Sequence, residues 1–425
     1  MRIPRNPPDI GTILSDVDRS KEVISEEASR YAKDFNRQYL HWSDVRMRDT
    51  GSLEPDIVWT RMKMVRSDSS VSMMFGGTKY QYLLSEGIVR TLFEFDRRSN
   101  KGLFSDAVDF RNKEYYSSSS LMEESIASSQ AEGAITTTRK AKEMLRQNIR
   151  PKDRSERMIL NNYKAMLFIK EHTEQPLTPQ LIKDIHRIVT DGTLDERFMG
   201  AFRDNDDVVV QDSITGEVFH QPVPKEEIES SVQQLCDYIN DDSSTIHPLI
   251  KGMILHYAIA FIHPFEDGNG RVARSLFYWY ELRSGYEIME YLALSRYIKD
   301  HKGRYEQSYI FGETDGNDMT YFMLYNLKAL EDSLESFERY LRSKTEEERV
   351  MRGRLSEYGL NDRQIGIFVG LMNGEDISVR SVVNQYGVSL NTARADISTL
   401  VDAGLITETG RDINSRIYSW SGKKV

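Results

Sequence analysis

Apolar residues recur along most of this chain at the three-to-four-residue spacing that buries one face of an amphipathic helix. The helices that this spacing predicts span residues 20–36, 121–133, 148–171, 181–189, 228–239, 250–262, 271–280, 318–337, 360–372, 377–386 and 391–403. Short strand-like segments form two hairpins, at 207–220 and 404–420. The serine run Ser117–Ser120 predicts a loop, and the charged stretch Lys344–Val350 predicts a solvated connector. The chain should therefore be mainly α.

The longest apolar run ends in a polar loop that contains two glycines. Residues 250–262 are apolar enough for a buried helix, which Pro264 and the triplet Gly268-Asn269-Gly270 then interrupt. A second apolar segment begins at Arg271, so the pattern predicts a helix, a tight loop and a new helix N-terminus. Backbone amides at a helix N-terminus point outward and favour an anion, and glycine lets a phosphate approach the main chain.

Four side chains in and beside this loop suit phosphate chemistry. Arg271 and Arg274 are three residues apart, so they share a helix face and can reach one charged ligand. Asp267 offers a hard oxygen for Mg²⁺, which binds through one or two carboxylates plus substrate phosphates. His263 lies at the loop rim as a titratable base. Together they predict a nucleotide phosphoryl site. The simpler alternative is a glycine loop between two core helices, with solvated arginines and a satisfied histidine.

The run His263-Pro-Phe-Glu-Asp-Gly-Asn-Gly-Arg-Val-Ala-Arg274 resembles the signature of the Fic family, His-x-Phe-x-(Asp/Glu)-Gly-Asn-Gly-Arg-x-x-Arg, at every defined position. The resemblance implies protein adenylylation, in which AMP passes from ATP to a Ser, Thr or Tyr hydroxyl. It assigns His263 as general base, Asp267 as the Mg²⁺ ligand, and Phe265 as a core anchor.

The same resemblance distributes the phosphates of ATP over the loop. It implies that Gly268, Asn269 and Gly270 hold the α-phosphate through backbone and amide, that Arg271 holds the β-phosphate, and that Arg274 holds the γ-phosphate. Family members that transfer phosphate instead carry a lysine where Gly270 stands, which disfavours phosphotransfer. Removal of AMP by the same site remains an alternative, as does a transcription regulator that only senses nucleotide.

A second, shorter resemblance lies upstream. Ser128, Glu132 and Gly133 fit the inhibitory helix (Ser/Thr)-x-x-x-Glu-(Gly/Asn) of Fic proteins, at the end of a predicted helix that the glycine stops. It implies that Glu132 bonds Arg274 and so occupies the arginine that the γ-phosphate needs. Taken alone, a glutamate at a helix end is usually just solvated. Its place ahead of the core favours the self-inhibited class with an N-terminal inhibitor.

The hairpin at 207–220 corresponds to the flap that covers the site in the Fic family. Its first strand contains Val208, Val209, Val210 and Gln211, and residues 213–216 form its turn. Such a flap can hold a target segment by strand addition, although a purely structural hairpin would have the same composition. Tyr305 and Tyr309 could flank the adenine or belong to the core.

The last predicted elements, three helices and a hairpin, resemble a winged helix. A DNA-binding role would use Asn391, Thr392 and Arg394 on the third helix. Basic and acidic residues balance over 350–425, whereas a DNA reader normally has a basic footprint. We therefore favour a protein contact over DNA for this module.

Composition limits the remaining possibilities. The 425 residues predict an N-terminal extension of unknown role (1–109), a Fic core (110–345) and the winged helix (346–425). A net charge of −10 disfavours nucleic acid and anionic membrane as bulk partners. One cysteine, Cys236, excludes a disulfide framework and indicates the cytoplasm. We expect no signal peptide and no membrane span. A homodimer is compatible with the sequence.

Overall fold

The computed structural model describes residues 4–100, 113–211, 216–356, 359–372, 377–412 and 415–421. The chain divides into two compact units, the first ending at Phe337 and the second beginning at Glu338. The predicted boundary at 109/110 lies outside the described residues, and the one at 345/346 falls within a continuous helix. The predicted class, mainly α, is confirmed, because the strands form only two-stranded sheets.

The first hundred residues form a helical module with one small hairpin. Its elements are α1 (Ile10–Ser15), α2 (Val17–Val23), α3 (Glu26–Arg37), α4 (Trp42–Val45), α5 (Pro55–Ser67), β1 (Val71–Phe75), β2 (Thr78–Tyr82) and α6 (Glu86–Asn100). Side chains of Asp9, Asp16 and Ser25 cap the first three helices by accepting backbone N–H bonds. Trp59 and Met62 on α5 are fully buried and centre the module's core.

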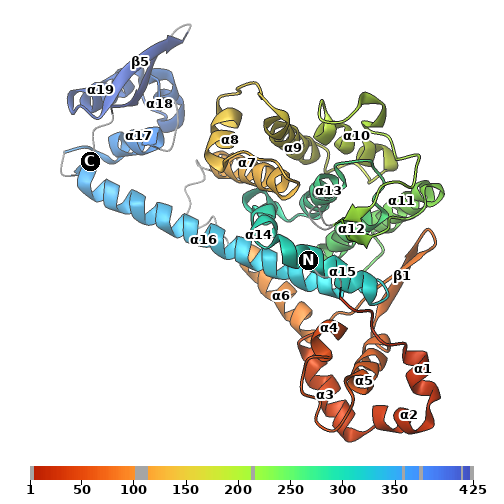
Figure 1. The fold of residues 1–425 in the computed structure, drawn as a ribbon. Coiled ribbons are helices and arrows are strands. Elements are labelled where there is room, and N and C mark those ends of the chain that lie inside the picture. Colours follow the sequence, from red (N-terminus) through yellow and green to blue (C-terminus); the bar gives the residue numbers. More distant parts are fainter. Residues whose placement is uncertain are drawn as a thin grey trace. The chain divides into compact units, whose positions relative to one another are not determined.

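The helical core follows and surrounds two central helices. Its elements are α7 (Lys113–Ala131), α8 (Thr138–Arg146), α9 (Arg154–Glu171), α10 (Pro179–Thr190), η2 (Glu196–Phe198), β3 (Val210–Gln211), β4 (Val218–His220), α11 (Lys225–Asn240), α12 (Pro248–Ile262), α13 (Asn269–Arg283), η3 (Glu287–Tyr291), α14 (Leu294–Asp300), α15 (Lys302–Thr314) and α16 (Thr320–Ser356). Helices α12 and α13 are buried on nearly every face and pack on each other, with α9 and α10 against α13 (Figure 1). Thr178 caps α10 ahead of Pro179.

The expected loop at the serine run is wrong, whereas the connector at 344–350 is solvated, as predicted. The serine run Ser117–Ser120 lies within α7, where the Ser117 hydroxyl donates to Glu290 Oε2 and the Ser120 hydroxyl donates to the Tyr291 carbonyl, both at 2.9 Å. The hydroxyls are satisfied by a neighbouring turn, so serine does not break this helix. Residues 344–350 are also helical, within α16, where local ion pairs such as Lys344–Glu347 support a solvated helix.

The second unit is a small domain of three helices and a hairpin. Helices α17 (Asp362–Met372), α18 (Val379–Tyr386) and α19 (Leu390–Asp402) precede the antiparallel strands β5 (Ile406–Asp412) and β6 (Ser415–Trp420). Ile377 adds a bridge to Tyr418, and both residues join the buried core of this unit. This order of elements confirms the predicted winged helix. No helix among the described residues of the protein is long and apolar enough to cross a membrane.

Candidate active site

The predicted helix–loop–helix is present. Helix α12 ends at His263, whose backbone is left-handed at φ 51°, and α13 starts after Gly268 at φ 85°. The loop therefore turns sharply at both ends. A left-handed histidine is unusual, and such residues cluster at functional sites.

The loop is closed from inside by Asn269. Its carboxamide accepts from Phe265 N at 3.0 Å and donates to the Phe265 carbonyl at 2.7 Å. Phe265 is fully buried, as predicted for an anchor. This buried carboxamide holds the loop, and its contact with a phosphate stays a prediction.

Two buried residues outside the motif also hold the loop, and the sequence analysis missed both. His186 stacks on Phe265 at 3.8 Å, donates from Nε2 to the Asp267 carbonyl and accepts from Gly200 N. Burial lowers the pKa of His186 to about 4, which keeps the ring neutral and suited to this donor–acceptor pair. Arg203 donates from Nε to the His263 carbonyl at 3.0 Å, and its backbone N–H donates to the Pro264 carbonyl at 2.9 Å.

His263 is oriented as a base. Its Nδ1 donates to the Ala260 carbonyl at 3.1 Å, so the lone pair of the neutral ring lies on Nε2. Burial is the main cause that lowers the pKa of His263, to about 4. The side chain nevertheless lines a cavity, so the ring is shielded from bulk water without being sealed in the core.

Arg271 is the unusual buried group of the site. It is fully buried, and its Nη1 donates to the Val189 carbonyl at 2.5 Å. Its Nε and Nη2 have no hydrogen-bond partner among the described residues, and Asp267 Oδ1 is 3.8 Å from Nη2. Burial lowers the pKa of Arg271. Two unpaired guanidinium N–H groups are costly in a protein interior, and an anionic ligand would satisfy them.

Arg274 is paired with the helix that ends at Ala131. Its Nε donates to Ser128 Oγ at 2.8 Å, and Nη2 donates to the Ser128 carbonyl at 3.1 Å and to Glu132 Oε1 at 2.9 Å. Burial would raise the pKa of Glu132, but the Arg274 charge and hydrogen bond outweigh it and the pKa is lowered. Ser128 and Glu132, the predicted inhibitory residues, are therefore in contact with Arg274, their predicted target.

Gly270 allows Glu132 to come this close. A methyl group built on Gly270 would overlap Glu132 Oε1 and lie 3.1 Å from Arg274 Nη1. The carboxylate thus rests against the first turn of α13, where backbone N–H groups attract anions. Glu132 occupies a place that an anionic ligand of this helix N-terminus would otherwise fill. Gly133, at φ 92°, ends the turn after α7.

Asp267 is half exposed. Its Oδ1 accepts from Gly268 N at 2.6 Å, and its Oδ2 pairs with Arg154 Nη2 at 3.0 Å. Arg154 is 63% exposed, so this pair is weak and easily displaced. Among the described residues no group of three or more His, Cys, Asp or Glu side chains could hold a metal. One displaceable carboxylate fits Mg²⁺ only if substrate phosphates complete the coordination.

A cavity of about 530 Å³ joins His263, Gly270, Arg274 and Glu132, whereas Asp267 and Arg271 are not among its lining residues. It is lined by Glu132, Val210, Gln211, Phe219, His220, Tyr257, Ala260, Phe261, His263, Gly270, Arg274, Lys302, Gly303, Tyr305, Glu306, Tyr309, Ile310 and Glu313. Tyr305 and Tyr309 lie on one wall, with their hydroxyls 3.1 Å apart, and Tyr305 also bonds His256 Nε2 at 2.9 Å. The two tyrosines are therefore core residues with one side facing the cavity.

The flap hairpin covers another side of the cavity. Strands β3 and β4 pair Val210 with His220, and Val210 and Gln211 line the cavity, whereas Val208 and Val209 precede the strand. His220 anchors the flap, since its Nε2 donates to the Phe261 carbonyl at 2.6 Å and its Nδ1 faces Glu313 at 3.0 Å. Of the predicted turn at 213–216, residues 213–215 lie outside the described residues.

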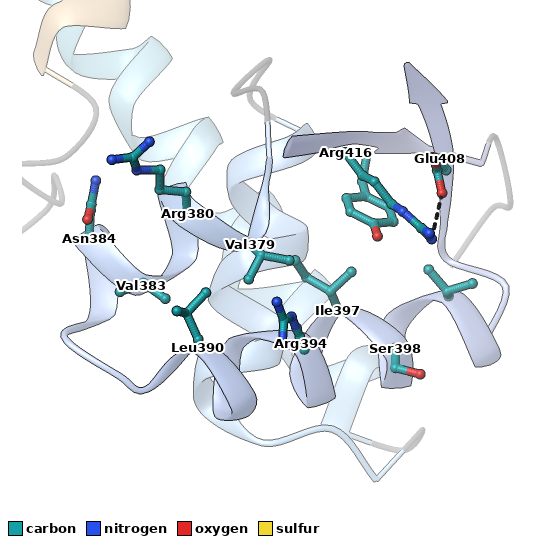
Figure 2. Close-up of a pocket in the computed structure, with 12 residues that line it drawn as sticks. Val379, Arg380, Val383, Asn384, Leu390, Arg394, Ile397, Ser398, Glu408 and Arg416 are labelled. Atoms are coloured by element: carbon teal, nitrogen blue, oxygen red, sulfur yellow. Dashed lines mark hydrogen bonds and ion pairs between the residues drawn. The ribbon is translucent and has the colours of Figure 1, made fainter. Parts of the chain in front are cut away.

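The winged helix contains a hollow of about 970 Å³ between α18, α19 and the hairpin (Figure 2). Apolar side chains of both helices line it, and Leu390 is 55% exposed. Arg416 pairs with Glu408 at 3.2 Å, while Arg380 and Arg394 pair with no acid among the described residues. Asn391 and Arg394 are exposed and Thr392 is half-buried, near the start of α19.

Comparison with known proteins identifies both modules. Residues 176–280 match the Fic/DOC family, and residues 363–410 match the DeoR-like helix-turn-helix domain. The chain is 41% identical over 66 residues to protein adenylyltransferase fic-1 of Caenorhabditis elegans, which covers 15% of this chain and 13% of that protein. It is 34% identical over 125 residues to protein adenylyltransferase Fic of Drosophila willistoni, which covers 29% of this chain and 23% of that protein. The chain thus matches less than a quarter of the length of these relatives.

Solved structures show the same fold. A Fic family protein from Desulfovibrio desulfuricans G20 aligns with a TM-score of 0.56 at 20% identity, over 81% of this chain and 98% of that one. Fic-1 from C. elegans, residues 134–508, aligns with a TM-score of 0.52 at 20% identity, over 80% of this chain and 89% of that one. The chain therefore contains a Fic/DOC domain, followed by a C-terminal helix-turn-helix domain.

Proposed function

We propose that this Fic-domain protein transfers AMP from ATP to a Ser, Thr or Tyr hydroxyl of a target protein, and that Glu132 holds its resting state inactive. One observation carries the proposal. The Arg274 guanidinium, in a cavity that also contains the free Nε2 side of His263, is bonded to a carboxylate at the N-terminus of α13. Arg274 and the N-terminus of α13 both attract anions, and the Glu132 carboxylate occupies both.

His263 acts on the attacking hydroxyl. Its neutral Nε2 accepts the hydroxyl proton while the hydroxyl oxygen bonds to the α-phosphorus of ATP. The bond between the α-phosphorus and the bridging oxygen breaks, and pyrophosphate leaves with that electron pair. The lowered pKa keeps the ring unprotonated near neutral pH, and the Ala260 carbonyl fixes the tautomer.

The loop and the two arginines bind the phosphates. Backbone N–H groups of Asn269 and Gly270, at the start of α13, face the α-phosphate oxygens, where charge develops during attack, while the Gly268 N–H donates to Asp267 Oδ1. The unpaired Nε and Nη2 of Arg271 suit the β-phosphate, since a phosphate oxygen would supply their missing acceptors. Arg274 holds the γ-phosphate once Glu132 has left it. Tyr305 and Tyr309 form the wall beside the nucleotide.

Asp267 is the residue that would hold Mg²⁺. Its ion pair with the exposed Arg154 would have to open before the carboxylate could bind the metal. Phosphates and water would supply the other oxygen ligands. When bound, Mg²⁺ neutralises charge on the leaving pyrophosphate. The flap residues Val210 and Gln211 present a strand edge to the target segment.

The reaction class is tested with two labels. The Glu132→Gly variant is incubated with cell lysate and either α-³²P-ATP or γ-³²P-ATP, with His263→Ala in the same background as control. AMP transfer predicts protein labelling from the α-label alone and none with the control. Labelling from the γ-label would replace the proposal with phosphotransfer. Loss of AMP from pre-labelled protein, faster in wild type than in Glu132→Gly, would favour the removal reaction.

For the winged helix we propose a contact with the target protein. The support is the hollow on this module, which combines exposed apolar side chains with two arginines that lack acidic partners. The described charged side chains of α17 to β6 comprise four arginines (363, 380, 394, 416) and four acids (362, 396, 402, 408), which is no basic footprint. DNA binding is the alternative that this fold suggests, and it would be seen as specific duplex binding at physiological salt.

A further inference from the structure

A cluster of buried charges joins the N-terminal module to the end of α15. Lys63 and Arg66 project from α5, and Asp315 and Asp318 lie in the turn between α15 and α16. Lys63 Nζ is 2.9 Å from Asp315 Oδ1 and 3.8 Å from Asp318 Oδ2. All four side chains are less than 10% exposed. Two cations face two anions, so the cluster is neutral as a whole.

Tyrosines complete the cluster. Tyr39 donates to Asp318 Oδ2 at 2.7 Å, and the Arg66 guanidinium lies 4.0 Å from the Tyr39 ring. Tyr321, at the start of α16, donates to Asp315 Oδ2 at 2.9 Å and accepts from Arg66 Nη1 at 2.8 Å. The two carboxylates and the guanidinium are therefore held by hydrogen bonds as well as by charge. Removing one partner from such a buried network leaves an uncompensated charge.

The module also contacts α15 directly. His41 stacks on Phe311 with ring centroids 4.0 Å apart, and its Nε2 lies 3.2 Å from Thr314 Oγ1. The β1–β2 hairpin adds main-chain bonds, because Gln81 N donates to the Asn317 carbonyl and Met319 N donates to the Gln81 carbonyl. The last turn of α15 and the residues after it are thus fixed by residues 39–81.

The same helix forms one wall of the cavity. Tyr305, Tyr309 and Glu313 line it, and Glu313 also anchors the flap through His220. The end of α15 is tightly packed, since a methyl group on Gly312 would lie 2.8 Å from Tyr257 Oη and 2.9 Å from the Asp318 carbonyl. A change in the turn at 315–318 therefore shifts the wall on which the nucleotide rests.

We propose that Lys63 and Arg66 of the N-terminal module are positioning residues for the nucleotide, which set the α15 wall of the cavity through Asp315 and Asp318. The proposal rests on the proposed nucleotide function of the cavity. It gives residues 1–100 a role in the site, although none of them lines the cavity. Weakening the cluster should loosen nucleotide binding more than it slows the chemical step.

The test measures binding and turnover separately in the full chain. In the Glu132→Gly background, calorimetry gives Kd for ATP with Mg²⁺, and α-³²P self-labelling at saturating ATP gives the maximal rate. Lys63→Met should raise Kd about tenfold and change the maximal rate less than threefold. Lys21→Met serves as the matched control, since Lys21 is 69% exposed and pairs only with the neighbouring Asp18, and it should change neither value.

Two further variants separate positioning from folding. Tyr39→Phe deletes only the hydroxyl that bonds Asp318, and should raise Kd about threefold in a folded protein. Lys63→Met with Asp315→Asn removes one charge of each sign, so Kd should return toward the parent value. A Kd unchanged in Lys63→Met and in Tyr39→Phe, whatever the melting temperature, would overturn the proposal. Absence of ATP binding in the parent would instead refute the proposed function.

Discussion

At the scale of single residues, His263 is the group on which the chemistry depends. His263→Ala should lower AMP transfer by about 10²–10⁴-fold, because it removes the side chain assigned to accept the hydroxyl proton. Binding of ATP, measured by calorimetry in the Glu132→Gly background, should change little. Labelling at the parent rate would refute the role of general base.

The pH dependence of transfer follows from the same residue. With a pKa of about 4, the ring is neutral and able to accept a proton above that pH. The rate at saturating ATP should therefore stay level from pH 8 down to about 5 and fall as pH approaches 4. A rate that drops by half near pH 6.5, the ordinary value for histidine, would show that His263 is more exposed to solvent in the working enzyme.

Glu281 predicts a second, independent effect of pH, on stability. It is fully buried, faces Gly252, and neither carboxylate oxygen has a hydrogen-bond partner among the described residues. Burial raises its pKa well above 4.5. When folding raises the pKa of an acid, the folded state loses stability as the pH rises above the pKa of that acid in the unfolded chain. The reason is that the unfolded chain ionises there and the folded state does not. Glu281→Gln should match wild type near pH 4.5 and melt higher at pH 8.

Thermal unfolding at both pH values checks this. The gain at pH 8 comes from the raised pKa, since each unit between the folded and the unfolded pKa is worth about 1.4 kcal/mol at a pH above both. An equal shift at pH 4.5 and pH 8 would mean that ionisation of Glu281 is not the cause.

The motif residues could be predicted from the sequence because they are close in sequence and chemically distinct. His186 and Arg203 could not, although they hold the loop at the Asp267 and His263 carbonyls. They lie 81 and 60 residues from the groups they bond, and a single buried histidine or arginine carries no local pattern. The bonds of the Asn269 carboxamide to the Phe265 backbone could not be predicted either, because a motif names a residue type and not the direction of its side chain.

At the scale of elements, the end of helix α7 and Glu132 just after it contact Arg274 near the N-terminus of α13. The Nε of Arg274 donates to the Ser128 hydroxyl, and its Nη2 donates to the Glu132 carboxylate, so this segment contributes two side-chain contacts. Ser128→Ala should loosen the pair and raise self-labelling a few-fold, less than loss of Glu132, since it removes a neutral hydrogen bond of about 1 kcal/mol.

Labelling by Ser128→Ala is compared with that by Ser120→Ala, whose hydroxyl bonds the Tyr291 carbonyl elsewhere on α7. Equal activation by both variants would attribute the effect to a weakened helix and not to Arg274.

Most helix positions in the core and the last module could be predicted from apolar periodicity, and the hairpins at 207–220 and 404–420 from alternation and turn residues. The β1–β2 hairpin and the helical state of the serine run and of the charged connector were not predicted. The serines are helical because η3 satisfies their hydroxyls, and the connector is helical because pairs such as Lys344–Glu347 repeat along one face. Local propensity is a weak guide where tertiary contacts or repeated ion pairs decide.

At the scale of the whole molecule, the winged helix should select targets. Arg394→Glu reverses one unpaired charge in its hollow, so it should change which lysate proteins are labelled by the Glu132→Gly variant. Self-labelling should be unchanged, since Arg394 belongs to the other compact unit. Arg416→Glu is unsuitable as a control because Arg416 pairs with Glu408, and Arg342→Glu, at an exposed position of α16 outside the hollow, is used instead.

An unchanged labelling pattern, together with binding of a specific duplex at 150 mM salt that Arg394→Glu abolishes, would assign this module to DNA.

The most direct measurement compares self-adenylylation of wild type, Glu132→Gly and Glu132→Gly with Arg274→Ala, by intact mass over time with ATP and Mg²⁺. A charge-assisted hydrogen bond is worth roughly 1.5–3 kcal/mol, and Glu132 is 36% exposed, so the lower end applies and the rate should rise about tenfold. The double variant should lose that gain, because the released arginine is missing. A single variant no faster than wild type would contradict the account, as would a double variant that keeps the faster rate.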